Sequence, residues 1–167
     1  GKSLSQQIED GTPGLYVCGG FQFLGKYYKE ADGSIVEGLG ILDLYTENPG
    51  EKANRLIGNI AVQPSIDKLP LVIGFENHGG RTYLGKKVKP LGKVIKGYGN
   101  NGEDGLEGTI YKNSFGTYMH GPILPKNPDL ADHFIKLALR ISYLPSLDDT
   151  TEKEARALIA KRLSINL

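Results

Sequence analysis

Short apolar runs separated by turn residues dominate residues 14–119 of the chain. Runs of this length, bounded by Gly, Pro, Asn and Asp, predict buried β-strands. The predicted strands are residues 15–17, 38–45, 56–62, 71–75 and 115–119. Residues 93–98 and 108–111 flank a polar turn with the sequence YGNNGEDGLEG, and we expect these two segments to pair as a hairpin.

Helical spacing marks both ends of the sequence. Residues 3–10 place Leu4 and Ile8 four positions apart, and the glycines and proline that follow end this helix. Near the C-terminus we expect a second helix with Asn127 as its N-cap, Pro128 at its first position and the apolar residues Leu130, Phe134, Leu137 and Ile141. A last helix is predicted to begin with a capping box formed by Thr151 and Glu154 and to bury Ala155, Leu158, Ile159 and Leu163.

This order of elements predicts an α/β fold, a twisted mixed sheet with helices on its faces. We expect one domain over residues 1–167, because no linker composition or internal repeat interrupts the pattern. The first helix leads straight into a strand, whereas a buried parallel strand needs neighbours on both sides. We therefore expect that earlier strands are missing and that the domain is N-terminally truncated.

Composition narrows the class of protein. The 167 residues are 39% hydrophobic and 23% charged, which is typical of a folded globular chain. Twenty basic and 19 acidic residues give a net charge of +1, and no basic run is long enough to attract nucleic acid. The single cysteine excludes an intramolecular disulfide and argues against a metal site. No apolar segment has the length of a membrane span, so we expect a cytoplasmic protein.

That cysteine, Cys18, lies at the most informative point of the sequence. A short strand ends there, Gly19 and Gly20 follow, and residues 21–24 begin a helix. Such an elbow exposes the side chain at its apex and directs backbone N–H groups and the helix dipole towards it. These effects favour a thiolate, and the Gly19 N–H could bind the oxyanion of a tetrahedral intermediate. We expect Cys18 to be a nucleophile, the alternative being a small buried apolar residue.

A thiol nucleophile needs a base, and three histidines compete for this role. His133 lies inside a predicted helix, four positions after Asp129, and is expected on the surface. His120 ends a strand at the sheet edge where Cys18 also lies, which is the edge at which α/β sheets bind ligands. We expect His120 to be the base, with a structural role as the alternative.

His78 lies between Glu76 and Arg81 in the glycine-rich segment GFENHGGRT. This segment could be a turn held by a salt bridge. Alternatively, Glu76 and His78 could support the site from behind the residues that touch the substrate. The sequence leaves both possibilities open.

Six segments together resemble a known family: VCGGFQFLGKYY, GLGILDLYT, NRLIGN, GFENHGGRT, YGNN and GTYMHGPILPKNP. They are similar, in the same order and over nearly the whole chain, to class I glutamine amidotransferases of the CobB/CobQ type. That resemblance implies a three-layer, flavodoxin-like α/β fold. It also implies a Cys18 nucleophile, a His120 base, and substrate binding by Arg55, Gly19 and Gln22. An arginine suits this role because its guanidinium binds a carboxylate bidentately, although a solvated Arg55 is the alternative.

The resemblance further implies a glutaminase subunit that converts L-glutamine to glutamate and ammonia. The ammonia would pass to a Mur-ligase-like partner, similar to MurT, which amidates D-glutamate in the lipid II stem peptide during peptidoglycan synthesis. No cofactor is expected in this subunit, and ATP and Mg are expected on the ligase. The alternatives are a free-standing Cys-His hydrolase of γ-glutamyl compounds, an amidotransferase of another pathway, and a non-catalytic subunit with a buried Cys18.

Two features depart from the family pattern. An earlier glycine-rich loop, which supplies a second oxyanion donor, would precede residue 1. In ordinary class I enzymes a glutamate two residues after the histidine orients the imidazole, but that position is Pro122 here. The site is therefore expected to be a dyad or to be completed from elsewhere, by Glu76 or by a partner.

Overall fold

The structure, a computed structural model, describes residues 1–50 and 52–166, which form helices at both ends and many short strands between them. The helices are α1 (Leu4–Glu9), α2 (Gly19–Phe23), α3 (Pro128–Leu139) and α4 (Thr150–Leu163). The strands are β1 (Gly14–Val17), β2 (Tyr27–Lys29), β3 (Ile35–Glu37), β4 (Leu44–Glu47), β5 (Leu56–Pro64), β6 (Val72–His78), β7 (Arg81–Leu84), β8 (Gly92–Lys96), β9 (Leu106–Glu107), β10 (Thr109–Tyr111), β11 (Ser114–Thr117) and β12 (Met119–His120).

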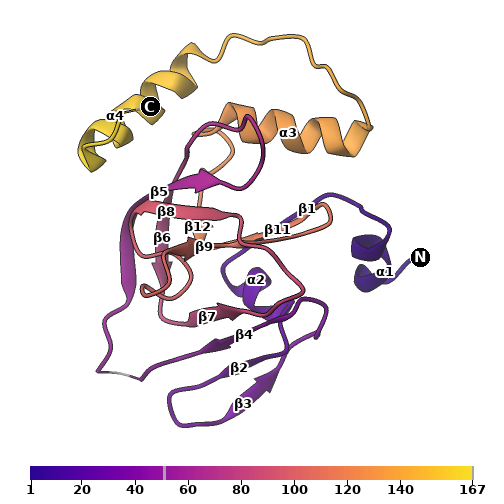
Figure 1. The fold of residues 1–167 in the computed structure, drawn as a ribbon, viewed down its shortest axis with the longest axis vertical. Coiled ribbons are helices and arrows are strands. Elements are labelled where there is room, and N and C mark those ends of the chain that lie inside the picture. The colour runs from indigo at the N-terminus through magenta and orange to yellow at the C-terminus, as the bar shows by residue number, and fades with distance from the viewer. Residues whose placement is uncertain (51, 167) are drawn as a thin grey trace.

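The described strands divide among three sheets, with orders β1-β11-β10, β12-β6-β5-β8-β9 and β3-β2-β4-β7. The pairs β1/β11 and β2/β4 are parallel, and the other pairs are antiparallel. Helix α2 lies between the β1-β11-β10 sheet and the β3-β2-β4-β7 sheet (Figure 1). Parallel and antiparallel pairing combined with packed helices agrees with the predicted α/β fold.

One short crossing links two of these sheets. Strand β11 pairs in parallel with β1, and after Tyr118 the chain continues as β12, which pairs with β6 in the next sheet. Tyr118 is fully buried at the crossing, and its ring meets the Phe21 ring edge-on, with ring centroids 5.4 Å apart. A Cβ at Gly116 would overlap that same Phe21 ring, so glycine lets α2 approach β11 closely. The crossing thus ties α2 to both sheets.

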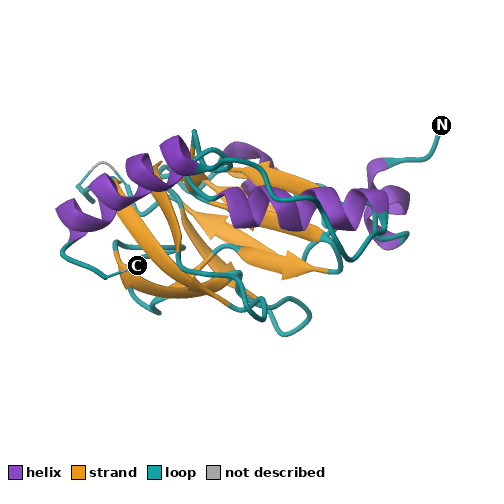
Figure 2. Ribbon diagram, turned by 90° about the horizontal axis from the view of Figure 1, so that it is seen from above, coloured by secondary structure: helices purple, strands orange, loops and turns teal. Residues whose placement is uncertain are grey.

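Helices α3 and α4 both pack against the β12-β6-β5-β8-β9 sheet (Figure 2). Leu130, Phe134 and Leu137 of α3 pack against a core cluster that includes Ile60, Val62, Leu91, Phe115 and Met119. Helix α4 covers the other face of the second sheet, where Ala160 packs on Ala61 and Ile73. Among the described residues no helix combines the length and apolarity that crossing a membrane requires.

Some predicted elements are confirmed and others are wrong. The first helix, the strands at 56–62 and 71–75 and the helix after Asn127 are present. The predicted strand 38–45 is limited to its last two residues, because Leu39, Ile41 and Leu42 instead donate backbone hydrogen bonds to Phe23 and Leu24 at the end of α2. The predicted hairpin is also wrong, since β8 pairs with β9 whereas β10 pairs with β11.

The C-terminal predictions need three corrections. Helix α4 begins after Asp149 with no side-chain cap, so Thr151 and Glu154 form no capping box. Its buried residues are Arg156 and Ala160. Of the predicted apolar face, Ile159 and Leu163 are partly buried and pack on the sheet, whereas Ala155 and Leu158 are exposed. His133 is half-buried on α3 rather than fully exposed, and its ring contacts the edge of Phe115 at 5.8 Å.

Candidate active site

Cys18 occupies the turn between β1 and α2, so the predicted strand, turn and helix are present. Its backbone has φ 51° and ψ −110°, a strained conformation for a residue with a Cβ. The Cys18 N–H donates to the Thr117 carbonyl at 2.9 Å, and the Cys18 carbonyl accepts from Gln22 N at 2.9 Å. The two hydrogen bonds hold the strained residue between the parallel strand pair and the helix.

The environment of the thiol differs from the expectation in one respect. Burial raises the pKa of Cys18 above its ordinary value, and this effect outweighs the hydrogen bond from the Gly19 backbone and the positive charge of Arg55. The elbow therefore does not by itself produce a thiolate at neutral pH. A neutral thiol at this position requires a base before it can attack.

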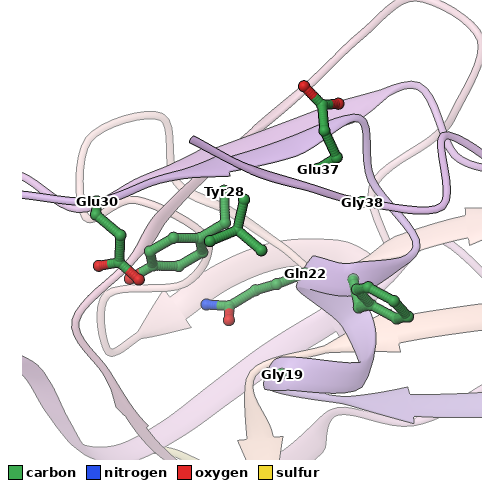
Figure 3. A pocket seen from close by; sticks show the side chains of 8 residues that line it. Gly19, Gln22, Tyr28, Glu30, Glu37 and Gly38 are labelled. Carbon is green, nitrogen blue, oxygen red and sulfur yellow. The ribbon is translucent and has the colours of Figure 1, made fainter. Parts of the chain in front are cut away.

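A pocket of ≈280 Å³ adjoins the elbow, lined by Gly19, Gln22, Phe23, Tyr28, Glu30, Val36, Glu37 and Gly38. Figure 3 shows Gln22 and Tyr28 reaching into the space between α2 and the β2/β3 hairpin, with Glu30 beside Tyr28. The Glu37 side chain points away from that space and is exposed. Two predicted substrate-binding residues, Gly19 and Gln22, thus line one pocket whose size suits a small ligand.

A chain of buried hydroxyl groups fixes Gln22. Its side-chain nitrogen donates to Tyr118 Oη at 2.9 Å, and Tyr118 Oη lies 2.6 Å from Thr82 Oγ1, which is itself 2.7 Å from Thr46 Oγ1. No residue in the described part of the chain donates to the side-chain oxygen of Gln22, Oε1. Because its nitrogen is engaged, Gln22 can offer this oxygen to a ligand as an acceptor.

Opposite charges surround Tyr28 at the edge of the pocket. Burial raises the pKa of Tyr28, the negative charges of Glu30 and Cys18 raise it further, and the positive charges of Arg55 and Arg81 oppose this. The carboxylate of Glu30, the guanidinium of Arg55 and the thiol therefore act on the same hydroxyl group. The sequence reasoning missed Glu30, although a carboxylate shortly after a nucleophile elbow is a visible signal for a cationic ligand group.

Arg55 precedes β5, and its guanidinium is held by one residue of β6. Its Nε and Nη2 donate to Asn77 Oδ1 at 3.1 and 3.0 Å, and Nη2 also donates to the Asn77 carbonyl at 3.3 Å. Arg55 is exposed and forms no salt bridge within residues 1–50 and 52–166. Its positive charge is therefore uncompensated and held in place, which suits the binding of an anionic group.

His120 ends β12, beyond the same end of the β1/β11 pair as Cys18. Its Nε2 is buried without a hydrogen-bond partner among the described residues. No hydrogen bond joins His120 to Cys18 in that part of the chain, although catalytic hydrogen bonds are often long before substrate binds. The fold brings the two residues to one edge and leaves Nε2 able to accept a proton.

Glu76 and His78 lie in the interior behind Tyr118. The Glu76 carboxylate accepts from Tyr98 N at 2.7 Å and from Gly99 N at 2.9 Å. The His78 ring stacks on Tyr118 with centroids 3.5 Å apart, and its Nδ1 lies 2.8 Å from the Gly80 carbonyl. Its Nε2 is 3.7 Å from Glu76 Oε2.

Neither of these residues contacts the substrate pocket directly or bonds to His120. His78 instead stacks on Tyr118, and Glu76 is held by the backbone amides of Tyr98 and Gly99. The described residues contain no group of His, Cys, Asp and Glu side chains that could hold a metal ion.

Comparisons with known proteins identify relatives over most of the chain. The model of the CobB/CobQ-like glutamine amidotransferase domain matches residues 1–128. The chain is 48% identical over 163 residues to the lipid II isoglutaminyl synthase (glutamine-hydrolyzing) subunit GatD of Staphylococcus aureus (strain N315), covering 95% of this chain and 64% of that protein. The same subunit of Streptococcus pneumoniae is 44% identical over 158 residues, covering 92% of this chain and 60% of that protein.

More distant relatives share the fold. A probable cobyric acid synthase of Methanothermobacter thermautotrophicus is 37% identical over 131 residues, covering 72% of this chain but 25% of that protein. A solved glutamine amidotransferase structure superposes with a TM-score of 0.58 at 18% identity, covering 81% of this chain and 66% of that one. Together with the family match, this confirms the predicted glutamine amidotransferase-like α/β fold.

Proposed function

Because this chain belongs to the CobB/CobQ-like glutamine amidotransferase domain family, we propose that it is a glutaminase that releases ammonia from L-glutamine for a ligase. The observation that carries the proposal is the elbow: a strained Cys18 beside a small pocket, with an unpartnered histidine nitrogen at the same sheet edge. A nucleophile, a base and a binding pocket are the parts that acyl transfer requires.

The reaction begins when Cys18 Sγ attacks the side-chain amide carbon of glutamine. The thiol proton passes to His120 Nε2, and the oxyanion that forms accepts a hydrogen bond from the Gly19 backbone. The C–N bond then breaks as His120 returns the proton to the leaving nitrogen, which departs as ammonia. Water, deprotonated by His120, cleaves the thioester, so that glutamate leaves and the thiol is restored.

The raised pKa of Cys18 makes His120 necessary rather than optional in this scheme. A neutral thiol gives up its proton as attack begins, so the developing charge moves directly to the substrate oxygen. The Gly19 N–H then stabilises the negative charge that develops on the substrate oxygen.

Recognition of a free amino acid follows from the charges around the pocket. We assign the α-carboxylate of glutamine to Arg55 and the α-ammonium to Glu30, because the two residues carry opposite charges and both act on Tyr28. Gln22 supplies a neutral acceptor between them. A guanidinium held by Asn77 loses little freedom when it binds a carboxylate, which favours affinity.

The proposed partner is a MurT-like Mur ligase that binds ATP and Mg and uses the ammonia to amidate D-glutamate of the lipid II stem peptide in the cytoplasm. Support comes from the S. aureus relative, which is named as one subunit of lipid II isoglutaminyl synthase. The chain spans 64% and 60% of the two relatives of that name, so the activity of the whole protein belongs to this proposal.

The partner also offers an acceptor for the His120 ring. His120 Nε2 is buried without a hydrogen-bond partner within the described residues, and Glu76, the acceptor considered from the sequence, is occupied by the amides of Tyr98 and Gly99. A carboxylate of the ligase that reaches His120 would fix its tautomer. Glutamine hydrolysis would then proceed fastest where ammonia can be used.

The test measures glutamate release from L-glutamine by the full-length protein, alone and with the ligase. We expect the partner to raise the rate at saturating glutamine, and we expect Cys18→Ser to reduce it below about one hundredth of wild type. Equal rates with and without the partner would favour a free-standing hydrolase. Turnover by Cys18→Ser close to wild type would refute the nucleophile.

A further inference from the structure

A second buried carboxylate lies directly against the crossing that joins Cys18 to His120. Glu107, in β9, is fully buried. Its Oε1 accepts from Thr117 Oγ1 at 2.6 Å and from the Tyr118 backbone N–H at 2.9 Å. One carboxylate oxygen therefore holds the last residue of β11 and the first residue after it.

Thr117 passes this constraint on in two directions. Its carbonyl accepts the N–H of Cys18 at 2.9 Å, and its hydroxyl oxygen accepts the N–H of Met119 at 3.0 Å. Met119 is the neighbour of His120. Hydrogen bonds thus tie Thr117 to Cys18 on one side and to Met119, the covalent neighbour of His120, on the other, and Glu107 anchors Thr117.

We propose that Glu107 is a positioning residue that sets the geometry between the Cys18 thiol and the His120 imidazole. This inference rests on the proposed function, because it requires the two residues to act as nucleophile and base. Glu107 does not touch the substrate. It fixes where the chain leaves the β1/β11 pair for β6, and a displacement of about 1 Å between reacting groups can slow an enzyme a hundredfold.

Burying the Glu107 carboxylate costs free energy, which favours a role for this residue other than stabilising the fold. Its Oε2 has no partner among the described residues, although it is buried. Burial raises the pKa of Glu107 to about 7, with Glu76 adding to the shift and Thr117, Tyr118 and His78 opposing it. A buried apolar residue would avoid this penalty. An apolar residue could not, however, receive both hydrogen bonds at the crossing.

The experiment compares how fast iodoacetamide alkylates Cys18 between pH 5 and 10 in variants of the full-length protein. Iodoacetamide is small and neutral, so its rate reports thiolate formation and not glutamine binding. If His120 assists the thiol, His120→Ala slows alkylation at pH 7 by about tenfold or more and moves the inflection to higher pH. We expect Glu107→Ala to reproduce this change and Glu107→Gln, which keeps an acceptor oxygen, to retain the wild-type profile.

Variants at two further residues separate positioning from loss of stability. Arg156 on α4 is a buried polar residue that donates to Asn127 and to the Leu71 carbonyl, away from the crossing. Arg156→Leu should therefore destabilise the fold without moving the alkylation profile. If Glu107→Ala does not fold, Thr117→Val removes the hydroxyl between Glu107 and Met119, and Thr117→Ser restores it.

The outcomes are distinct. A profile in Glu107→Ala or Thr117→Val that matches His120→Ala, with Glu107→Gln and Thr117→Ser normal, supports the inference. A wild-type profile in Glu107→Ala, or in Thr117→Val where the former does not fold, overturns it, as does an equal change in Arg156→Leu. If His120→Ala itself leaves the profile unchanged, the Cys-His pairing of the proposed function fails first.

Discussion

Two regions of the molecule treat buried polar groups in opposite ways: the α4 end, where helix α4 packs, and the elbow end, around Tyr118 and the strands that adjoin it. At the end covered by α4, the Asn127 amide donates to the Ile73 and Ile123 carbonyls and accepts from Ile73 N and Arg156. At the end near the elbow, His78 Nε2, His120 Nε2 and Glu107 Oε2 are buried without partners among the described residues. The Asn127 amide is hydrogen-bonded at the α4 end, whereas the elbow end keeps buried polar atoms that have no hydrogen-bond partner within residues 1–50 and 52–166.

We interpret this difference as a division between residues that stabilise the fold and residues that serve the reaction. An unsatisfied buried group costs about 1–3 kcal/mol, and the backbone of Cys18 adds strain in the same region. We attribute these costs at the elbow end to a site that must bind or move protons, and none of the atoms without a partner in the described part of the chain belongs to the residues on which α4 packs. Substitutions at the elbow end should therefore change kinetics, whereas substitutions at the α4 end should change stability.

The largest expected effect at the elbow end, apart from loss of the thiol, is that of Arg55→Ala. A charge-assisted carboxylate interaction contributes about 1.5–3 kcal/mol, so the KM for glutamine should rise about 10- to 150-fold. Alkylation of Cys18 by iodoacetamide should slow far less, because that reagent has no carboxylate. Steady-state kinetics and alkylation measured on the same preparation test this, and equal losses in both would make Arg55 a structural residue.

Glu30→Gln should raise the KM for glutamine by about tenfold, since it removes the charge that we assign to the α-ammonium. Glu37→Gln is the matched control, because Glu37 belongs to the same hairpin but its side chain is exposed and points away from the pocket (Figure 3). The two variants are compared by steady-state kinetics. Similar KM values for both would remove Glu30 from substrate recognition.

The contribution of Glu107 to stability should depend on pH. Its folded pKa of about 7 lies above the ordinary value of 4.5, so the folded protein holds this proton more tightly than the unfolded chain does. The stabilisation is fully present below pH 4.5 and is lost as the pH rises through 7. Urea unfolding should show wild type losing stability relative to Glu107→Gln over that window, and a constant difference would contradict the raised pKa.

The smallest effect on the reaction is expected from the satisfied end. Arg156→Leu should lower the free energy of unfolding by about 1 kcal/mol, because the Leu71 carbonyl and the Asn127 amide lose a donor. Glutamine kinetics should stay at wild-type values. A fall in kcat with unchanged stability would contradict the claim that the α4 end serves stability and the elbow end serves the reaction.

Local signals made the elbow and the main strands predictable. Glycines directly after Cys18, and apolar runs such as 56–62, depend on neighbouring residues alone. The predicted hairpin was wrong because β10 turns back on β11 through residues 112 and 113, with Tyr111 opposite Ser114, whereas β8 pairs with β9 instead. Thr151 and Glu154 have the spacing of a capping box, but the helix begins after Asp149.

For the candidate site, residues in recognisable local segments were predictable, whereas residues that matter through distant contacts were not. Cys18, His120, Gln22 and Arg55 stand in segments that resemble the family, and they remain proposals for function. Glu107 could not be found from the sequence, because its importance comes from a contact with Thr117 across two sheets. The raised pKa of Cys18 could not be predicted either. The sequence indicates the helix dipole and the backbone N–H groups at the elbow, but it does not indicate how deeply the thiol is buried.

The most direct measurement of the central claim is peptide mapping after treatment with a glutamine analogue that carries an electrophilic carbon at the amide position. The account predicts one adduct, on Cys18, which L-glutamine suppresses and which forms slowly in Arg55→Ala and His120→Ala. A wild-type protein labelled elsewhere, or labelled on Cys18 with no protection by L-glutamine, would contradict the claim that this elbow and its pocket bind and cleave glutamine.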